Sequence, residues 1–135
     1  MDTGEIPLMA MLKDRMAWLG RRQQVLSQNV ASVDVPGYTP HDLKPMDFEQ
    51  TLKSSLLSSA GSLTVTDPHH ISTKSSSDFE EQNDADVVAA PNGNSVSLEA
   101  QMIKVADTQA QYAAAANLYA KAIGMMKTAI GHGGM

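Results

Sequence analysis

The sequence predicts a mainly α-helical protein, in which two long helices at the N- and C-termini pack as a coiled-coil-like hairpin or bundle. Apolar residues recur every three or four positions toward each end of the 135-residue chain, which places them on one face of a helix. The stretch between the two patterns is rich in Ser, Asp, Asn and Gly. Aromatic residues make up only 4% of the chain, and Ala and nine Met supply much of its apolar content, which suits packing of helix against helix.

The first helix is expected from about Pro7 to Asp34. Pro36 cannot continue a helix and Gly37 permits a sharp change of direction, so the helical pattern must stop before them. The apolar positions of this helix lie four and three residues apart, with a glutamine at one step. The predicted first seam consists of Leu12, Met16, Leu19, Gln23, Leu26 and Val30.

The second helix has the longest regular pattern in the chain, since its four-and-three rhythm continues for more than four heptads. Asn94 or Ser95 is expected to cap its start. Glu99 in the first turn, Lys127 near the end and Gly131 just beyond are all placed in the favoured sense for a helix. The predicted second seam consists of Leu98, Met102, Val105, Gln109, Tyr112, Ala116, Tyr119, Ile123 and Met126.

Each predicted seam contains one glutamine. Gln23 and Gln109 can meet and fix the register of the two helices, as a polar residue in a coiled-coil seam does, or they can simply face solvent. The second helix also has an alanine-rich flank that another helix can approach closely. A single hairpin would not cover this flank and both seams, so the sequence predicts self-association. The flank comprises Ala110, Ala113, Ala114, Ala115, Ala120 and Ala122.

The chain divides into three parts: residues 1–50 with the first helix and the turn after it, a polar middle segment at 51–94, and residues 95–135 with the second helix. Within the middle segment, residues 63–66 alternate as a short strand does, and residues 86–90 are its expected partner in a β-hairpin. The rest is expected to be loop. Loops this long are uncommon in a compact domain, so we expect the segment to become ordered on contact with neighbouring molecules.

Composition and charge exclude several classes of function. Ten basic and fifteen acidic residues give a net charge of −5, and no basic cluster is denser than Arg21 and Arg22, which argues against nucleic-acid binding. The absence of cysteine excludes disulfides and thiolate metal sites. No basic leader with a small-residue cleavage site precedes the first helix, and no segment has the length of a membrane span, so no cleaved signal peptide is expected.

Histidine and aspartate residues that could in principle surround a divalent metal are Asp67, His69, His70, His41 and Asp42. Adjacent histidines point in different directions in an extended chain, and no pair of histidines shares a helical face in the manner of known zinc motifs. No nucleophile with a nearby base and no glycine-rich phosphate loop is present. The sequence therefore predicts no enzyme, no cofactor and no small-molecule substrate.

The first helix could alternatively lie on a membrane surface, because it has apolar residues alongside a short basic face. The second helix lacks a comparable basic face, so membrane binding would depend on one element. The residues concerned are Met9, Met11, Leu12, Trp18 and Leu19 with Lys13, Arg15, Arg21 and Arg22.

Residues 29–38 carry a specific motif at the point where the first helix stops. The run resembles the signature of the bacterial flagellar basal-body rod protein family, in which Asn, Ala, Pro, Gly and Tyr hold fixed positions. Ser32 and Val35 depart from that signature. The matching residues are Asn29, Ala31, Pro36, Gly37 and Tyr38, and the resemblance continues at Asp42, Asp47, Phe48, Thr66, His70, Ile71 and residues 93–96.

This resemblance implies a structural subunit, closest to the proximal rod proteins, whose terminal helices form the inner coiled-coil-like part of a hollow drive shaft. The implied partners are other rod subunits, the basal-body ring and adaptor proteins, and further copies of the chain. The implied location is the periplasmic rod of the flagellar basal body, reached through the flagellar type III export gate. Phe48 and Leu52 match the short export-gate motif of such subunits and would share one helical face, although a local packing pair has the same spacing.

Overall fold

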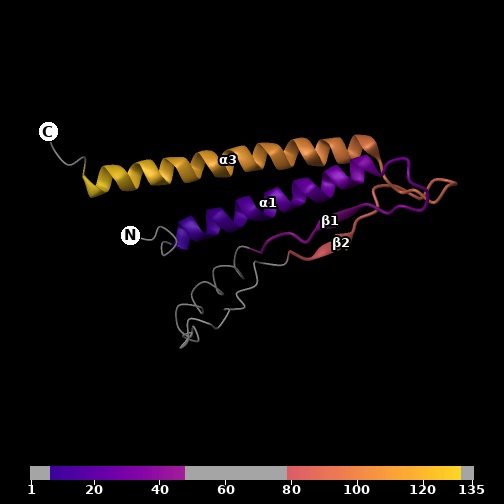
Figure 1. Cartoon of the computed structure of the whole chain (residues 1–135), viewed down its shortest axis with the longest axis horizontal. Helices are drawn as coiled ribbons and strands as arrows, with labels where there is room; N and C mark the ends of the chain where they lie inside the picture. The colour runs from indigo at the N-terminus through magenta and orange to yellow at the C-terminus, as the bar shows by residue number, and fades with distance from the viewer. Residues whose placement is uncertain (1–6, 48–78, 132–135) are drawn as a thin grey trace, which may run out of the picture.

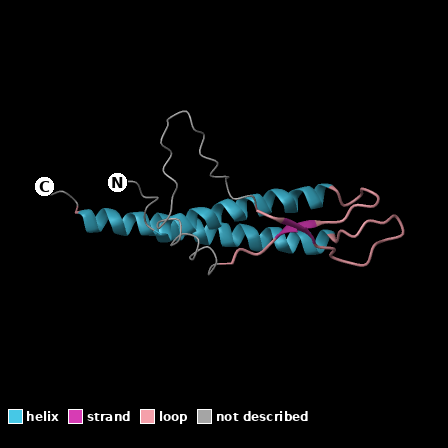
Figure 2. Ribbon diagram, turned by 90° about the horizontal axis from the view of Figure 1, so that it is seen from below, coloured by secondary structure: helices cyan, strands magenta, loops and turns pink. Residues whose placement is uncertain are grey.

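The computed structural model describes residues 7–47 and 79–131, and it is mainly helical, as the sequence predicts. Two helices, α1 (Pro7–Ala31) and α3 (Leu98–Ile130), run antiparallel and pack side by side (Figures 1 and 2). Because α3 has 33 residues and α1 has 25, the last turns of α3 extend beyond the start of α1 (Figure 1). We call this the free end of the helix pair.

The opposite end of the helix pair, here called the closed end, consists of residues 32–40 after α1 and residues 84–97 before α3 (Figure 1). Beside it, β1 (His41–Leu43) and β2 (Glu81–Asn83) form a two-stranded antiparallel sheet. His41 lies opposite Asn83 and Leu43 lies opposite Glu81. The sheet packs against α1 through β1.

The predicted strand pairing was wrong for the residues that the structure describes. Residues 86–90 form no strand, and residues 63–66 lie outside the described part of the chain. The physical reason is that Asp86 is fixed under the start of α3, where its carboxylate accepts hydrogen bonds from Ser97 and Gln101. With Asp86 held in this position, residues 86–90 do not pair with another strand in the described part of the chain.

The first seam largely faces the inside of the helix pair. Leu19 and Leu26 are fully buried, and Met9, Trp18 and Val25 are buried beside them. α1 ends at Ala31, three residues before the predicted end, because the chain then continues in tight turns. Apolar burial of this kind contributes on the order of 1.5–3 kcal/mol for each large side chain.

The start of α3 differs from the prediction. Ser97 is its N-cap and accepts a hydrogen bond from the N–H of Ala100, whereas the sequence predicts Asn94 or Ser95 as the cap. Asn94 has another role, since its side chain donates to the carbonyls of Ser32 and Val35 in the turn after α1. The predicted end of the helix is confirmed: Gly131 is the C-cap, and its N–H donates to the carbonyl of Thr128.

The face of α3 that is buried is not the predicted second seam. It is a line of small and polar residues that lie seven apart: Gln101, Thr108, Ala115 and Ala122. Seam residues Leu98, Met102 and Tyr112 instead remain about half exposed. The spacing of apolar residues identified a helical face correctly, but it could not show that small side chains on the neighbouring face allow the closer approach to α1.

Candidate functional site

Asn29 is the centre of a buried hydrogen-bond network at the closed end. Its side-chain nitrogen donates to the carbonyl of His41 at 2.7 Å and to Oε1 of Gln101 at 3.0 Å. Its side-chain oxygen accepts from the hydroxyl of Tyr38 and from the N–H of His41, both at 3.0 Å. The residue is fully buried and every hydrogen-bonding position of its amide is used, so it locks α1, β1 and α3 together.

Two glycines bring the turn after α1 against the segment that leads into α3. Gly37 has a φ of 73° and donates its N–H to the carbonyl of Asn92 at 3.0 Å. Gly93 has a φ of 81°, and a Cβ at that position would lie 3.2 Å from the Cα of Gly37. Positive φ is a conformation that glycine adopts without steric cost. The positive φ favours glycine at both positions, and the close approach of the two segments additionally requires glycine at position 93.

Asn94 closes the end of α1 from the other side of this turn. Its side-chain nitrogen donates to the carbonyl of Ser32 at 3.1 Å and to that of Val35 at 2.7 Å. Its side-chain oxygen accepts from the N–H of Val96 at 2.8 Å. Both carbonyls also accept a backbone hydrogen bond within the turn, from the N–H of Val35 and of Tyr38, so Asn94 ties the turn after α1 to the segment that leads into α3.

Asp86 continues the network from Gln101 toward the surface. The side-chain nitrogen of Gln101 donates to Asp86 at 2.7 Å, and Nζ of Lys104 donates to it at 2.8 Å. Burial alone raises the pKa of Asp86, but the hydrogen bonds from Gln101, Lys104 and the N–H of Ser97 outweigh it, so the pKa lies below its ordinary value. Gln101 thus links Asn29 to a charged pair.

A second ion pair ties α1 to the sheet. The guanidinium of Arg22 donates two hydrogen bonds of 2.8 Å to the carboxylate of Asp42, which also accepts from the N–H of Leu43. Burial raises the pKa of Asp42, yet these donors hold it below its ordinary value. Arg22 also lies over the ring of Trp18 at 5.5 Å, and the indole N–H donates to the carbonyl of Lys44. Trp18 is therefore fixed within one copy of the chain.

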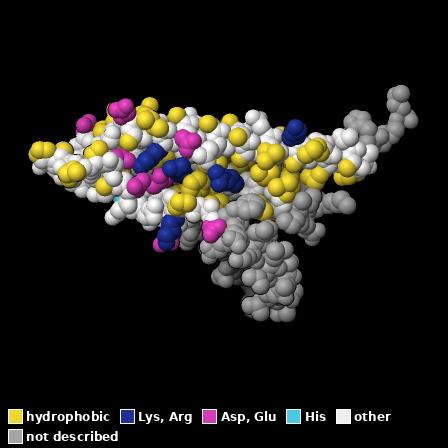
Figure 3. Space-filling model, turned by 180° about the vertical axis from the view of Figure 1, so that it is seen from behind, with side chains coloured by type: hydrophobic (Ala, Val, Ile, Leu, Met, Phe, Trp, Pro, Cys, Tyr) yellow, Lys and Arg dark blue, Asp and Glu magenta, His cyan; other side chains and the backbone are white. Residues whose placement is uncertain are grey.

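Charged and apolar side chains are distributed differently over the surface. In Figure 3 most acidic side chains lie toward the closed end, while hydrophobic side chains are spread along the whole molecule. Several large apolar residues of α3 are exposed, including Ile130 at 74%. Large exposed apolar side chains in this number on one helix are typical of a surface that another molecule covers. The other exposed examples on α3 are Leu98, Met102, Ile103, Tyr112, Leu118 and Met125.

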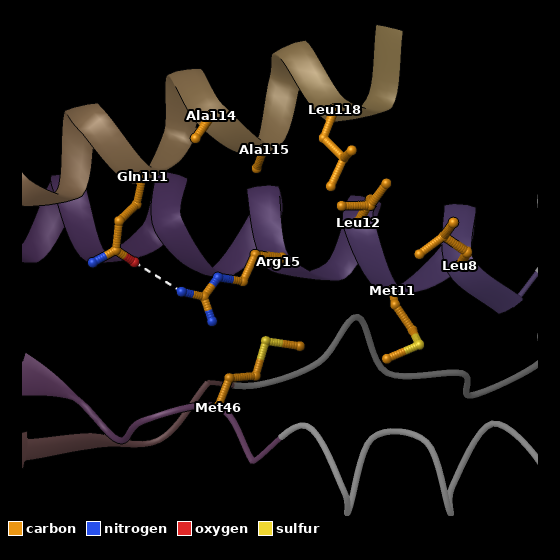
Figure 4. A pocket seen from close by; sticks show the side chains of 9 residues that line it. All are labelled: Leu8, Met11, Leu12, Arg15, Met46, Gln111, Ala114, Ala115 and Leu118. Carbon is orange, nitrogen blue, oxygen red and sulfur yellow. Dashed lines mark hydrogen bonds between the residues drawn. The ribbon is translucent and has the colours of Figure 1, made fainter. Parts of the chain in front are cut away.

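An apolar hollow of about 530 Å³ lies between the first turns of α1 and the middle of α3 (Figure 4). A hydrogen bond of 2.8 Å from Arg15 to Gln111 lies beside it. In Figure 4, Leu12 of α1 and Leu118 of α3 point toward one another across it, and Met46 approaches from the segment after β1. The other residues that line it are Leu8, Met11, Ala114 and Ala115.

The two seam glutamines lie beside the same smaller hollow, of about 310 Å³, next to Gly20 and Tyr112. Gln109 is exposed on its rim. Gln23 turns its Oε1 inward, and this oxygen is buried without a hydrogen-bond partner in the described part of the chain. The two side chains thus share a surface, but they do not bond to each other within one copy.

The other candidate residues from the sequence are placed as follows. The partly buried residues of the second seam are Val105, Ala116, Tyr119, Ile123 and Met126. Those of the first seam include Leu12, Met16 and Val30. Ala31 and Pro36 are exposed at the turn. The export-gate pair Phe48 and Leu52, and the residues Asp67, His69 and His70, lie outside the described residues.

Within residues 7–47 and 79–131, no three acidic or histidine side chains come together in a way that could hold a metal ion. His41 is in β1, and Asp42 is engaged by Arg22. Neither helix described here is both long and apolar enough to cross a membrane.

Sequence reasoning missed four contributors to the closed end: Gln101, Asp86, Lys104 and Arg22. A signal for the first of them exists, because Gln101 begins the line of residues seven apart that includes Thr108. That line lies one position away from the apolar seam, and its small or polar character concealed it. Asp86 and Arg22 have no local signal, since their partners are distant in the chain.

Comparison with known proteins adds no relative: the chain matches no known protein family, and no curated protein is significantly similar to it. A functional assignment therefore depends on the residues and contacts described above. Two features are available for it, the buried network at the closed end and the exposed apolar series on α3.

Proposed function

We propose that the chain is a structural subunit of the bacterial flagellar basal-body rod, most similar to the proximal rod protein FlgB. Its first support is the signature at residues 29–38, with the separate matches farther along the chain. Some of these matches bond to one another at the closed end, where Tyr38 donates to Asn29 and the carbonyl of Tyr38 accepts from the N–H of Ser95. Asp42 lies beside them in β1, whereas Phe48, Thr66, His70 and Ile71 lie outside the described residues. Contacts between matching residues that are far apart in the chain support a common role for them.

The observation that carries the proposal is the exposed apolar seam on α3. Met102 and Tyr112 are 55% and 46% exposed, although they belong to the most regular apolar series in the sequence. Keeping such side chains in water forgoes roughly 25 cal/mol for each Å² that a partner could bury. A surface of this kind, fitting a different surface on the next subunit, generates an open helical assembly.

The closed end supplies the second requirement of a drive shaft, which is a subunit that transmits torque without changing shape. A buried polar network with all members satisfied specifies one arrangement of the elements that it joins. Here it fixes the register of α1 relative to α3 through Asn29 and Gln101. The hairpin can then act as a stiff unit within the rod.

The partners in this proposal are other rod subunits, further copies of the chain, and the ring and adaptor proteins of the basal body. The subunit would reach the periplasmic rod through the type III export gate, with Phe48 and Leu52 as the recognition pair. The nearest alternative within the family is another rod subunit with similar terminal helices. The membrane-surface alternative has less support, because Trp18 and Leu19 face the interior of the molecule.

The decisive experiment places a charge in the seam. Tyr112→Asp and Ile123→Asp should each abolish rod assembly and swimming, because a carboxylate would be buried at the contact between subunits. Both purified variants should remain soluble and helical. Asn117→Asp, at an exposed position of the same helix, is the matched control and should swim normally.

Normal swimming by both seam variants would contradict the assembly role. Circular dichroism over a concentration series supplies an independent measurement: the helicity of the wild-type chain should rise as it associates with itself or with rod partners. Lipid vesicles test the alternative class, since a membrane-surface protein gains helicity on vesicles at a fixed protein concentration.

A further inference from the structure

α3 carries a third series of residues seven apart, in addition to its seam and its buried line. We call it the outer stripe, and all five members are exposed. It has an acidic residue at one end, a basic residue at the other, and three alanines between them. Its members are Glu99, Ala106, Ala113, Ala120 and Lys127.

The outer stripe is complementary to itself when two helices run antiparallel. The acidic end of each helix then lies beside the basic end of the other, and alanine meets alanine along the middle, where small side chains let the two backbones approach. Charged residues that flank a helical seam set the orientation of the pair in this way. The facing residues are Glu99 with Lys127, Ala106 with Ala120, and Ala113 with its own counterpart.

The same antiparallel arrangement also brings the exposed seam of one helix onto the seam of the other. Leucine and isoleucine meet at each end of the contact, and methionines meet one step farther in. The end pairs are Met102 with Met126 and Leu98 with Ile130, which follows Met126 at the spacing of the seam. Apolar residues therefore face apolar residues along α3, except where Gln109 faces Tyr119.

We propose that two copies of this chain pair antiparallel through α3, along the seam and the outer stripe. α1 does not obstruct the contact, because it packs on the line that contains Gln101 and Ala115, on the other side of the seam. A parallel pair in register would set Lys127 against Lys127 and Glu99 against Glu99, so like charges disfavour it.

The antiparallel pair closes on itself, because each copy offers the same surface to the other. It therefore cannot extend into a tube. If the chain is a rod subunit, the pair covers the seam that assembly requires and holds the free protein in a form that does not polymerise. This consequence depends on the proposed function, whereas the pairing itself does not.

Disulfide trapping tests the pairing, since the chain has no cysteine of its own. Ala113→Cys places two thiols at the two-fold axis, and oxidation should convert most of the protein to a covalent dimer. Ala110→Cys is the matched control, because Ala110 is also exposed and lies only three residues away but off the outer stripe. Sedimentation of the wild-type chain should give twice the monomer mass of 14.4 kDa.

Charge exchange tests the orientation. Lys127→Glu should weaken the dimer at least several-fold, and adding Glu99→Lys in the same chain should restore it, because each new charge then faces its opposite. A monomer at high concentration, equal cross-linking of the two cysteine variants, or no restoration in the double variant would overturn the pairing. Larger assemblies without the Ala113 cross-link would overturn the pairing and leave the proposed rod function intact.

Discussion

The network at the closed end and the exposed face of α3 differ in how they are stabilised. In the network, Asn29, Asn94 and Asp86 are each engaged by several hydrogen bonds within a single copy. On the exposed face of α3, from Met102 near the closed end to Ile130 at the free end, large apolar side chains contribute little within one copy. The contrast indicates that the network is complete by itself and that the exposed face is completed by a second molecule. Substitutions should therefore affect stability in the network and association on the exposed face.

The largest effect on stability is expected for Asn29→Ala at the closed end. The substitution removes four hydrogen bonds and leaves the N–H and carbonyl of His41 and the amide of Gln101 buried without their partner. An unsatisfied buried polar group costs roughly 1–3 kcal/mol, so the free energy of unfolding should fall by about 3 kcal/mol or more. Urea unfolding followed by circular dichroism measures it.

Asn117→Ala is the control for this substitution, since Asn117 is exposed on α3 and should change the free energy of unfolding by less than about 0.5 kcal/mol. Equal losses in the two variants would mean that the network at Asn29 does not hold the closed end together. The contrast between the two regions would then have no basis.

The next largest effect is expected for Asp42→Asn. It removes the charge that pairs with Arg22, and the free energy of unfolding at neutral pH should fall by ~2 kcal/mol, the value of a hydrogen bond to a charged group. Asp14→Asn, on the exposed surface of α1, is the matched control and should change it little.

The pH dependence sharpens the same test. The pKa of Asp42 in the folded protein lies below its ordinary value of 3.8, so the unfolded chain binds the proton more readily. The stabilisation is therefore complete above about pH 5 and is lost as the pH falls through the ordinary pKa to the lower folded value. Asp86 contributes in the same direction. Asp42→Asn should make the acid limb of the stability profile shallower, and an unchanged limb would exclude the pair as its source.

A smaller effect, with a sign that depends on the region, is expected from replacing glycine by alanine. Gly93→Ala should destabilise the protein by about 1–2 kcal/mol, because the residue has positive φ and its new Cβ would meet the backbone of Gly37. Gly124→Ala near the free end has open space around it and lies inside α3, so it should stabilise the helix by about 0.5–1 kcal/mol. Thermal melting of both variants decides this, and a loss of stability in both would contradict it.

The sequence predicted the two helices well because their periodicity is a local property of the chain. Pro36 and Gly37 also located the end of α1 to within a few residues, and Gly131 located the end of α3. The pairing of helix faces was not local. Ala115 packs on α1 because its small side chain allows close approach, and Gln101 packs there because it hydrogen-bonds to Asn29; neither residue stands out in a pattern of large apolar residues.

The closed end was predictable only in part, for the same reason. The signature identified Asn29 and Tyr38 as special residues, but it did not show that they bond to one another or that Gln101, 72 residues farther along, completes the set. Asn94 was expected to cap the start of α3 and closes the end of α1 instead. Contacts between distant segments depend on the packed geometry, so a pattern read along the chain cannot supply them.

The smallest effect on the free energy of unfolding, and the one that separates the two regions most cleanly, is expected for Met102→Ser. Because the side chain is 55% exposed, its loss should cost a dilute single copy less than about 0.5 kcal/mol. At high protein concentration the same variant should lose the additional stability that association gives the wild-type chain, since the seam contact is then missing. Urea midpoints measured at two concentrations a hundredfold apart test both statements. A loss of more than 1.5 kcal/mol in the dilute protein, which is the cost of removing a buried side chain, would show that α3 covers its seam within one copy and needs no second molecule.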